Sequence, residues 1–202
     1  KGDIIHLTDG KGQLLTCEIA ETGKKNCLVA IKDVMSQKAK TKSVSIGISL
    51  LKNPSRFEWF LEKATEIGVA EIIPLVCDRT EKEKFRWERF QNICISAMLQ
   101  SRQYWLPKLY EPKIFHDAVM NTNAVTKLIA HCEDTNKNEL KDFVNMEANE
   151  SNITIILIGP EGDFTSEEIN HAITNNFVPV SMGITRLRTE TAGVVAAAML
   201  VS

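Results

Sequence analysis

Two glycine-bearing segments hold the residues whose types and spacing best suit chemistry in this chain of 202 residues. The first is LIGPEGDFTSEEI, at 157–169, and the second is MGITRLRTETAGVVAAA, at 182–198. Gly159, Gly162 and Gly183 let the backbone approach a ligand closely, because glycine carries no Cβ. Two segments of this kind, close together in the sequence, predict one shared ligand pocket.

The elements that would position these segments are short buried strands and helix starts. Apolar runs at 153–158 and 177–182 precede the two segments and predict strands that are buried on both faces. Ligands of open α/β sheets lie beyond the carboxyl ends of such strands. Thr165 and Glu168 have capping-box spacing, and residues 189–191 offer a cap and a first-turn acid. For either loop taken alone, an ordinary strand-to-helix turn is the alternative.

The rest of the chain divides into an N-terminal antiparallel unit and a region of alternating strands and helices. The stretches DIIHL, LLTCEIA and CLVAIKDV are separated by turn residues, so residues 2–35 predict part of a small β-barrel. Residues 36–43 are polar and predict a linker. The following alternation predicts a mainly parallel α/β sheet with helices on both faces. Its expected strands include 44–51, 71–76 and 127–132, and its expected helices run from a Ser55–Glu58 capping box to Gly68, over 86–103 and over 136–145.

Composition bounds the class of protein. Hydrophobic residues make up 44% and charged residues 25%, which is ordinary for a soluble globular protein, and no apolar run reaches the roughly 20 residues of a membrane span. Five scattered cysteines without a C-x-x-C pair argue against a disulfide framework and against zinc, and favour a reducing, cytoplasmic compartment. Because Lys1 is not a natural start, a leading segment is expected to be missing.

Charge is distributed unevenly along the chain, although the net charge is only −2. Residues 1–43 hold eight lysines and five acids, a net charge of +3, and the remainder carries −5. A basic small domain beside an acidic one permits an anionic partner at the basic end. A solvated lysine-rich surface is the alternative.

Several common catalytic and binding motifs are missing from the sequence. It contains no P-loop, no G-x-G-x-x-G fingerprint, no G-x-S-x-G elbow and no H-E-x-x-H pair. The histidines are dispersed, and His131, Cys132 and Glu133 lack a fourth ligand, so no metal site is expected. At the carboxyl end of a strand, the same trio would form a pocket wall.

Four segments carry a resemblance to a known family. They are EKATEIGVAEIIPLVCDR at 62–79, SAMLQSRQYWLP at 96–107, LIGPEGDF at 157–164 and LRTETAG at 187–193. In this order and separation they resemble the RsmE family of SPOUT methyltransferases, and the resemblance covers nearly the whole chain. It implies methyl transfer from S-adenosylmethionine to N3 of a uridine in 16S ribosomal RNA of the small ribosomal subunit.

The same resemblance implies a two-part α/β protein. Residues 1–42 would form a PUA-like β-barrel that binds RNA and lacks its first strands, and residues 43–202 would form a SPOUT domain with a deep trefoil knot. The family is a homodimer with the pocket near the subunit interface. Five positions depart from the common pattern and bear on the RNA-facing contacts more than on the pocket: Leu99, Gln103, Asp163 (where the family often has Gly), Thr185 and Arg186.

The resemblance also implies roles for individual residues. Arg188 would bind a phosphate or a uracil oxygen that carries negative charge, and a surface or dimer salt bridge is the alternative. Glu161 and Glu190 are candidate proton acceptors, although the helix dipole alone favours an acid at position 190. The catalytic candidates are thus Arg188 and Glu190. The expected cofactor-binding residues are Ala130, His131, Cys132, Ile158, Gly159, Pro160, Glu161, Gly162, Met182, Gly183, Leu187, Arg188, Thr189, Glu190, Thr191 and Ala192. The expected RNA-binding residues, each with a solvated surface charge as the alternative, are Lys24, Lys25, Lys52, Arg56, Arg79, Arg102 and Arg186.

Three functions fit these residues. The leading one is an S-adenosylmethionine-dependent rRNA uridine N3-methyltransferase. The second keeps the fold and modifies another RNA base or site, and the third is a non-catalytic RNA-binding module on an enzyme scaffold. The presence of both GPEG and LRTETA favours an enzyme, because a module that lost catalysis would not need both. The sequence leaves open which uridine is modified and whether free rRNA or the assembled subunit is the substrate.

Overall fold

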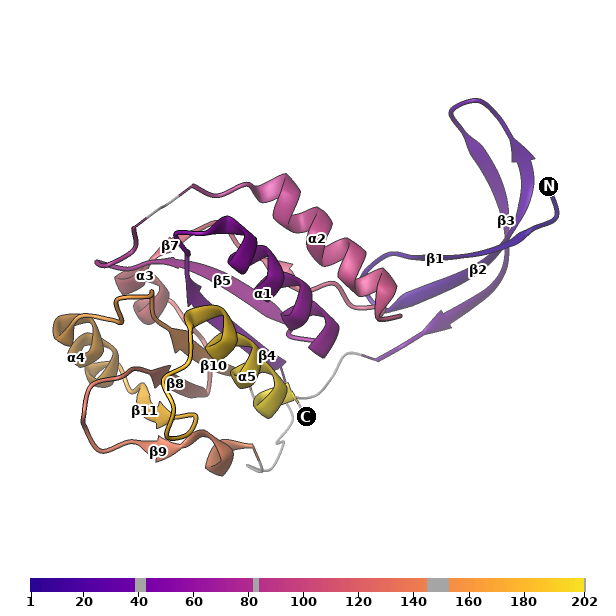
Figure 1. Cartoon of the computed structure of the whole chain (residues 1–202). Helices are drawn as coiled ribbons and strands as arrows, with labels where there is room; N and C mark the ends of the chain where they lie inside the picture. Colours follow the sequence, from indigo (N-terminus) through magenta and orange to yellow (C-terminus); the bar gives the residue numbers. More distant parts are fainter. Residues whose placement is uncertain (39–42, 82–83, 145–152, 202) are drawn as a thin grey trace.

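A computed structural model describes residues 1–38, 43–81, 84–144 and 153–201 of the chain. It has a body built on a parallel sheet, and a three-stranded antiparallel arm that projects from this body (Figure 1). The arm holds the basic N-terminal end of the chain. The body holds both glycine-bearing segments, so the candidate pocket belongs to the body.

In the described part of the chain, the sheet of the body has eight strands, and each of their pairings is parallel. Its order is β6–β5–β4–β10–β8–β11–β9, with β7 pairing to β5. The central strands are rich in Ile because helices cover both faces of the sheet. The α/β class and the parallel sheet that the sequence predicts are therefore confirmed. The strands are β4 (Ser43–Ser49), β5 (Glu71–Val76), β6 (Lys108–Leu109), β7 (Lys113–Ile114), β8 (Thr126–Ala130), β9 (Asn138–Glu139), β10 (Ile153–Ile158) and β11 (Val178–Ser181).

Two hydrophobic clusters lie on the two faces of this sheet. Alternate residues of one strand point to opposite faces, so Ile156 of β10 joins one cluster while Ile155 and Leu157 join the other. The Ile156 cluster contains α1 (Pro54–Ile67), α2 (Trp87–Gln100) and α5 (Thr189–Val201). The opposite cluster contains α3 (Phe115–Met120) and α4 (Ser166–Thr174). A Cβ at Gly193 would lie only 2.6 Å from the Phe60 ring, so glycine is what lets α5 approach α1 closely.

Helix ends confirm some of the local predictions and correct others. The Thr165–Glu168 capping box of α4 is present, and Gly68 ends α1 with φ 95°. The Ser55–Glu58 capping box is wrong, because Asn53 is the N-cap: its side chain accepts a hydrogen bond from the Ser55 N–H, and Pro54 occupies the first turn. Asn caps as well as Ser, and Pro is favoured just after the cap.

The prediction of a helix over 136–145 is also wrong for the residues of this range that the structure describes. Residues 138–139 form the short strand β9, and Leu140–Phe143 form a single 3₁₀ turn, η1. Residue 145 lies outside the described residues. The pairing of β9 with β11 explains the difference, because a sheet edge overrides weak helical propensity in so short a segment.

The arm consists of β1 (Ile4–Thr8), β2 (Gln13–Thr22) and β3 (Cys27–Ser36), paired in antiparallel order. The turn between β1 and β2 contacts the body: the Gly12 N–H donates to the Tyr104 carbonyl at 2.7 Å, and the Leu106 N–H donates to the Gly10 carbonyl at 2.9 Å. The predicted antiparallel unit is thus confirmed. The barrel, the knot and the domain boundary at 42 stay predictions, and residues 39–42 of the predicted linker lie outside the described part of the chain.

Candidate ligand-binding site

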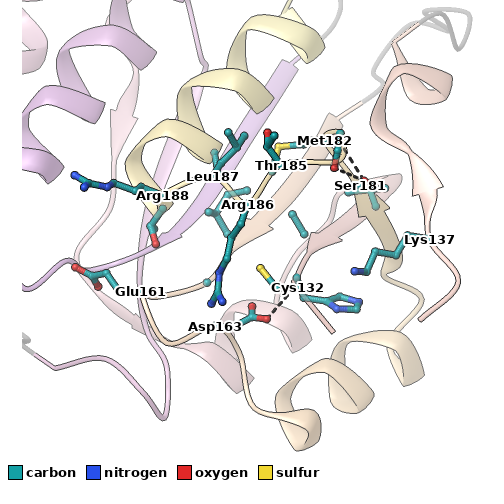
Figure 2. A pocket seen from close by; sticks show the side chains of 18 of the residues that line it. Cys132, Lys137, Glu161, Asp163, Ser181, Met182, Thr185, Arg186, Leu187 and Arg188 are labelled. Carbon is teal, nitrogen blue, oxygen red and sulfur yellow. Dashed lines mark hydrogen bonds between the residues drawn. The ribbon is translucent and has the colours of Figure 1, made fainter. Parts of the chain in front are cut away.

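A pocket of about 600 Å³ opens at the carboxyl ends of β8, β10 and β11 and is completed by the first turn of α5 (Figure 2). Its volume lies within the range of about 300–1,000 Å³ that is typical of small-molecule sites. Its place is the one that parallel α/β sheets use for ligands. The lining consists of residues 130–132, 158–161 and 180–189, together with Lys137, Asp163 and Ala192.

Most of the residues predicted to bind a cofactor line this pocket. Gly162, Glu190 and Thr191 are the exceptions, since they lie outside the lining. The predicted residues that line it are Ala130, His131, Cys132, Ile158, Gly159, Pro160, Glu161, Met182, Gly183, Leu187, Arg188, Thr189 and Ala192. The lining residues that the cofactor-site prediction missed are Lys137, Asp163, Val180, Ser181, Ile184, Thr185 and Arg186.

The loop from β10 to α4 forms one wall of the pocket. Asp163 has φ 65°, and its two carboxylate oxygens accept hydrogen bonds from the Cys132 N–H at 2.7 Å and the Phe164 N–H at 2.9 Å. This side chain therefore ties the end of β8 to the loop. A Cβ at Gly159 would lie 3.1 Å from the Phe164 nitrogen and ring, so the tight path of the loop favours glycine there.

The loop from β11 to α5 forms the opposite, more exposed wall. Gly183 has φ 123°, a conformation that other residues rarely adopt. The Ser181 hydroxyl bridges this turn, accepting from the Gly183 N–H at 3.3 Å. Figure 2 shows the Arg186 side chain directed toward Asp163 and the Arg188 side chain directed away from it. Both arginines are exposed, so their charges are available to a ligand or an anionic partner.

His131 is the clearest sign that the pocket is built for a polar ligand. The residue is only 7% exposed, and neither ring nitrogen has a hydrogen-bond partner within the described ranges. Burial lowers the pKa of His131, and the nearby positive charge of Lys137 lowers it further. The neutral ring offers one donor and one acceptor. Buried polar atoms are rarely left unpaired, so a ligand in this pocket is the expected partner.

Glu190 lies beside the pocket but is not one of its lining residues. The residue is 7% exposed, and its Oε1 lies 3.6 Å from the Nε of Arg56 on α1. Its Oε2 is buried and has no hydrogen-bond partner in the described part of the chain. The neighbouring residues Thr189 and Ala192 do line the pocket. Glu190 therefore joins α5 to α1, while its neighbours contact the cavity.

The residues predicted to bind RNA lie on different elements of the fold. Lys24 and Lys25 are exposed in the turn between β2 and β3, at the arm, and exposed Arg102 follows α2 with φ 54°. Two others lie near the carboxyl ends of the strands and have partners there. The Nζ of Lys52 lies 2.6 Å from the Oε2 of Glu81, and Arg79 donates to the carbonyls of Gly162 and Phe164. Arg56 contacts Glu190, and Arg186 lines the pocket.

The described residues contain neither a metal-binding cluster nor a helix that could span a membrane. No three or more His, Cys, Asp and Glu side chains of residues 1–38, 43–81, 84–144 and 153–201 lie together as a metal-ion site would require. None of the helices described in these ranges is both long enough and apolar enough to cross a membrane.

Comparison with known proteins gives relatives for nearly the whole chain. A family model described as an RNA methyltransferase domain matches residues 37–201. A protein named ribosomal RNA small subunit methyltransferase E, from Synechocystis sp., is 29% identical over 202 residues, which cover 99% of this chain and 66% of the relative. The chain therefore spans just under two thirds of the length of that relative.

Solved structures resemble this chain in the body and in the arm. A probable rRNA-methyltransferase from Porphyromonas gingivalis aligns with a TM-score of 0.89 and 36% identity, over 97% of this chain and 82% of that one. A putative methyltransferase from Legionella pneumophila, in complex with bound S-adenosylmethionine, aligns with a TM-score of 0.85 and 28% identity, over 99% and 83% of the two chains.

Proposed function

Because this chain belongs to the RNA methyltransferase family, and within it to the RsmE family, we propose that it methylates N3 of a uridine in 16S ribosomal RNA with S-adenosylmethionine as the methyl donor. The observation that carries the proposal is the pocket at the carboxyl ends of β8, β10 and β11, because both glycine-bearing segments line it. The resemblance to the Legionella protein, which binds S-adenosylmethionine, supports this choice of cofactor.

The residues of the pocket fit this cofactor. Ile158, Met182 and Leu187 supply apolar surface against which an adenine ring would pack, and backbone groups around Gly159 and Gly183 would reach its polar edge. The unpartnered ring nitrogens of His131 would donate to and accept from polar groups of the cofactor. When bound, S-adenosylmethionine supplies an electrophilic methyl group on a sulfonium ion.

The reaction forms a bond between this methyl carbon and the uracil N3 and breaks the bond between carbon and sulfur. The N3 proton is released, and the sulfonium becomes a neutral thioether. Protein groups contribute mainly by holding the reactants in line. The guanidinium of Arg188 would stabilise negative charge on a uracil oxygen as the proton leaves.

Two glutamates are candidates for accepting the N3 proton. Glu161 is exposed and lines the pocket, whereas Glu190 is buried toward Arg56. Figure 2 shows Glu161 and Arg188 on the same side of the pocket, opposite Lys137. We therefore assign proton acceptance to Glu161, directly or through water, and assign to Glu190 the task of holding α5 in place.

The proposal includes a cytoplasmic homodimer that binds the small-subunit rRNA. The composition of α5 supports a dimer, because this helix is apolar around its circumference, yet Ala198 is exposed and Val194 and Val195 are half-buried. A helix that is apolar all round is normally buried. The net charge of +3 in residues 1–43 supports RNA binding by the arm.

Calorimetry and nucleoside analysis together test the proposed function. Purified protein should bind S-adenosylmethionine, and it should add N3-methyluridine to 16S rRNA taken from a strain that lacks the corresponding gene. If a base other than uridine is methylated, the assignment of uridine as the substrate is wrong. Absence of cofactor binding would favour a non-catalytic RNA-binding module instead.

A further inference from the structure

Arg79 reaches from the end of β5 to the cofactor loop between β10 and α4. Its Nη1 donates hydrogen bonds to the Gly162 carbonyl at 2.8 Å and to the Phe164 carbonyl at 3.3 Å. The stem of the side chain covers the same loop, because a Cβ built on Gly162 would lie 3.4 Å from the Cδ of Arg79. One arginine thus spans the outer side of a loop whose inner side lines the pocket.

The turn that carries Arg79 is itself held firmly. The Thr80 hydroxyl oxygen accepts from the Cys77 N–H at 2.9 Å and lies 3.0 Å from the Ser49 hydroxyl. The Asp78 N–H donates to Glu168 at 3.0 Å. A guanidinium on so well-fixed a backbone has less freedom to lose when it binds, so its hydrogen bonds are worth more.

Glu168 connects the turn after β5 to the start of α4. The residue is 1% exposed, and its carboxylate accepts from the Asp78 N–H through one oxygen and from the Thr165 N–H, at 2.9 Å, through the other. Both of its oxygens are satisfied, and it lies in the first turn of α4, where the helix dipole favours negative charge. The turn after β5 and the start of α4 are therefore one connected unit.

We propose that Arg79 is a positioning residue of the cofactor pocket, which holds the 159–164 loop in its binding conformation, rather than an RNA contact. The proposal rests on the proposed function. Its physical basis is pre-organisation: with Arg79 outside the loop and Asp163 tying it to Cys132, the loop is ordered before the cofactor arrives. Without Arg79, the cofactor would have to order Pro160 and Glu161 as it binds, at a cost in affinity.

The test compares Arg79→Ala and Arg79→Lys with Lys84→Ala, an exposed cation of the same β5–α2 loop. Arg79→Ala should raise the Kd for S-adenosylmethionine about tenfold, the order expected when hydrogen bonds to a charged group are lost. Arg79→Lys keeps the charge but loses the planar fork, so it should raise the Kd by about threefold. Lys84→Ala should leave the Kd unchanged.

Amide hydrogen exchange provides a second readout that needs no ligand. Amides of 161–164 should exchange faster in Arg79→Ala than in the wild type, and as slowly as the wild type in Lys84→Ala. RNA affinity at saturating cofactor should fall equally in the two alanine variants, since each removes one charge. If exchange and cofactor affinity stay at wild-type values in Arg79→Ala while its RNA affinity falls further than that of Lys84→Ala, Arg79 is an RNA contact and the proposal is overturned.

The exchange measurement also separates this proposal from the proposed function. If the wild-type protein binds no S-adenosylmethionine, the proposed function fails, but faster exchange in Arg79→Ala would still show that Arg79 holds the loop. If the wild-type protein binds the cofactor and the loop amides of Arg79→Ala exchange at the wild-type rate, the role of Arg79 is overturned and the proposed function stays intact.

Discussion

The Nε of Arg56 lies 3.6 Å from the Oε1 of Glu190, and this contact joins α1 to the first turn of α5 beside the pocket. Arg56 is half-buried and Glu190 is buried. The sequence marks Arg56 as an RNA-binding candidate and Glu190 as a catalytic one, but each side chain faces the other. The geometry therefore favours a structural task for both residues.

Glu190→Gln should keep kcat within about tenfold of the wild type. A proton acceptor contributes roughly 10²–10⁴ to the rate, whereas a half-exposed ion pair contributes about 0–1 kcal/mol to stability. Arg56→Gln removes the same ion pair but leaves the buried Glu190 carboxylate without its cation, so it should lower Tm more than Glu190→Gln does. The measurements are kcat at saturating cofactor and Tm by calorimetry. A hundredfold loss of kcat in Glu190→Gln, with Arg56→Gln near normal, would restore Glu190 as the proton acceptor.

Arg188→Ala should lose most methylation while its affinity for S-adenosylmethionine changes by no more than a few-fold. Removing a group that stabilises developing negative charge typically costs about 10²–10³ in kcat. Arg188→Lys, which keeps the charge but not the fork, should recover part of the rate. Cofactor affinity is measured by calorimetry and kcat with saturating rRNA. The assigned role is wrong if cofactor affinity collapses while turnover at saturation stays normal.

Local features of the fold could be read from the sequence because they depend on neighbouring residues. Ile-rich runs predicted the buried strands β4 and β10, and the spacing of Thr165 and Glu168 predicted the start of α4. The cap of α1 was misplaced because Asn53 and Ser55 are both good caps and only the folded backbone distinguishes them.

Contacts between distant residues could not be read in the same way. The reach of Arg79 to Gly162 and of Asp163 to Cys132 depends on which strand ends the sheet order brings together. Lys137 enters the pocket from a segment without an apolar pattern, so no signal in the sequence marks it. Glu168 accepts from the Asp78 N–H in addition to its role in the capping box, and this second contact could not be predicted for the same reason.

Asp163→Ala and Asp163→Gly should separate backbone strain from lost hydrogen bonds. Both variants remove the acceptors for the Cys132 and Phe164 N–H groups, but only alanine must keep a side chain at φ 65°. Alanine in that region costs roughly 1–2 kcal/mol, and glycine does not. Asp163→Ala should therefore have the lower Tm and the weaker cofactor affinity. Equal values for the two variants, measured by calorimetry, would show that backbone strain at position 163 is negligible.

His131 should make folding stability depend on pH below about 6.5. Burial lowers the pKa of His131 from its ordinary value of 6.5, so the folded protein holds fewer protons there than the unfolded chain. Stability is then fully present above 6.5 and is lost as pH falls from 6.5 through the lowered pKa. His131→Gln cannot titrate and should flatten this slope in chemical denaturation between pH 7.5 and 5.5. The control is His6→Gln, on exposed β1, and identical slopes in wild type and His131→Gln would contradict the prediction.

Lys24→Ala combined with Lys25→Ala should weaken rRNA binding and reduce its salt dependence. Both lysines are exposed in the turn at one end of the arm, where their charges are accessible to phosphates. Each lost phosphate contact should reduce the slope of log K against log salt by about 0.7–0.9, so the double variant should lose about 1.4–1.8. Cofactor affinity should be unchanged, because every lining residue of the pocket lies at position 130 or beyond.

Lys32→Ala is the matched control for the Lys24, Lys25 double variant, because Lys32 is on the same arm but its Nζ lies 2.6 Å from the Oε2 of Glu18. A lysine already paired with a carboxylate has less charge to offer a phosphate, so this variant should change the salt slope by clearly less than 0.7. The comparison also excludes a general effect of net charge, since every substitution removes one positive charge. Equal slopes for the wild type and the Lys24, Lys25 double variant would show that this turn does not contact RNA, and the basic N-terminal charge would then be a solvated surface.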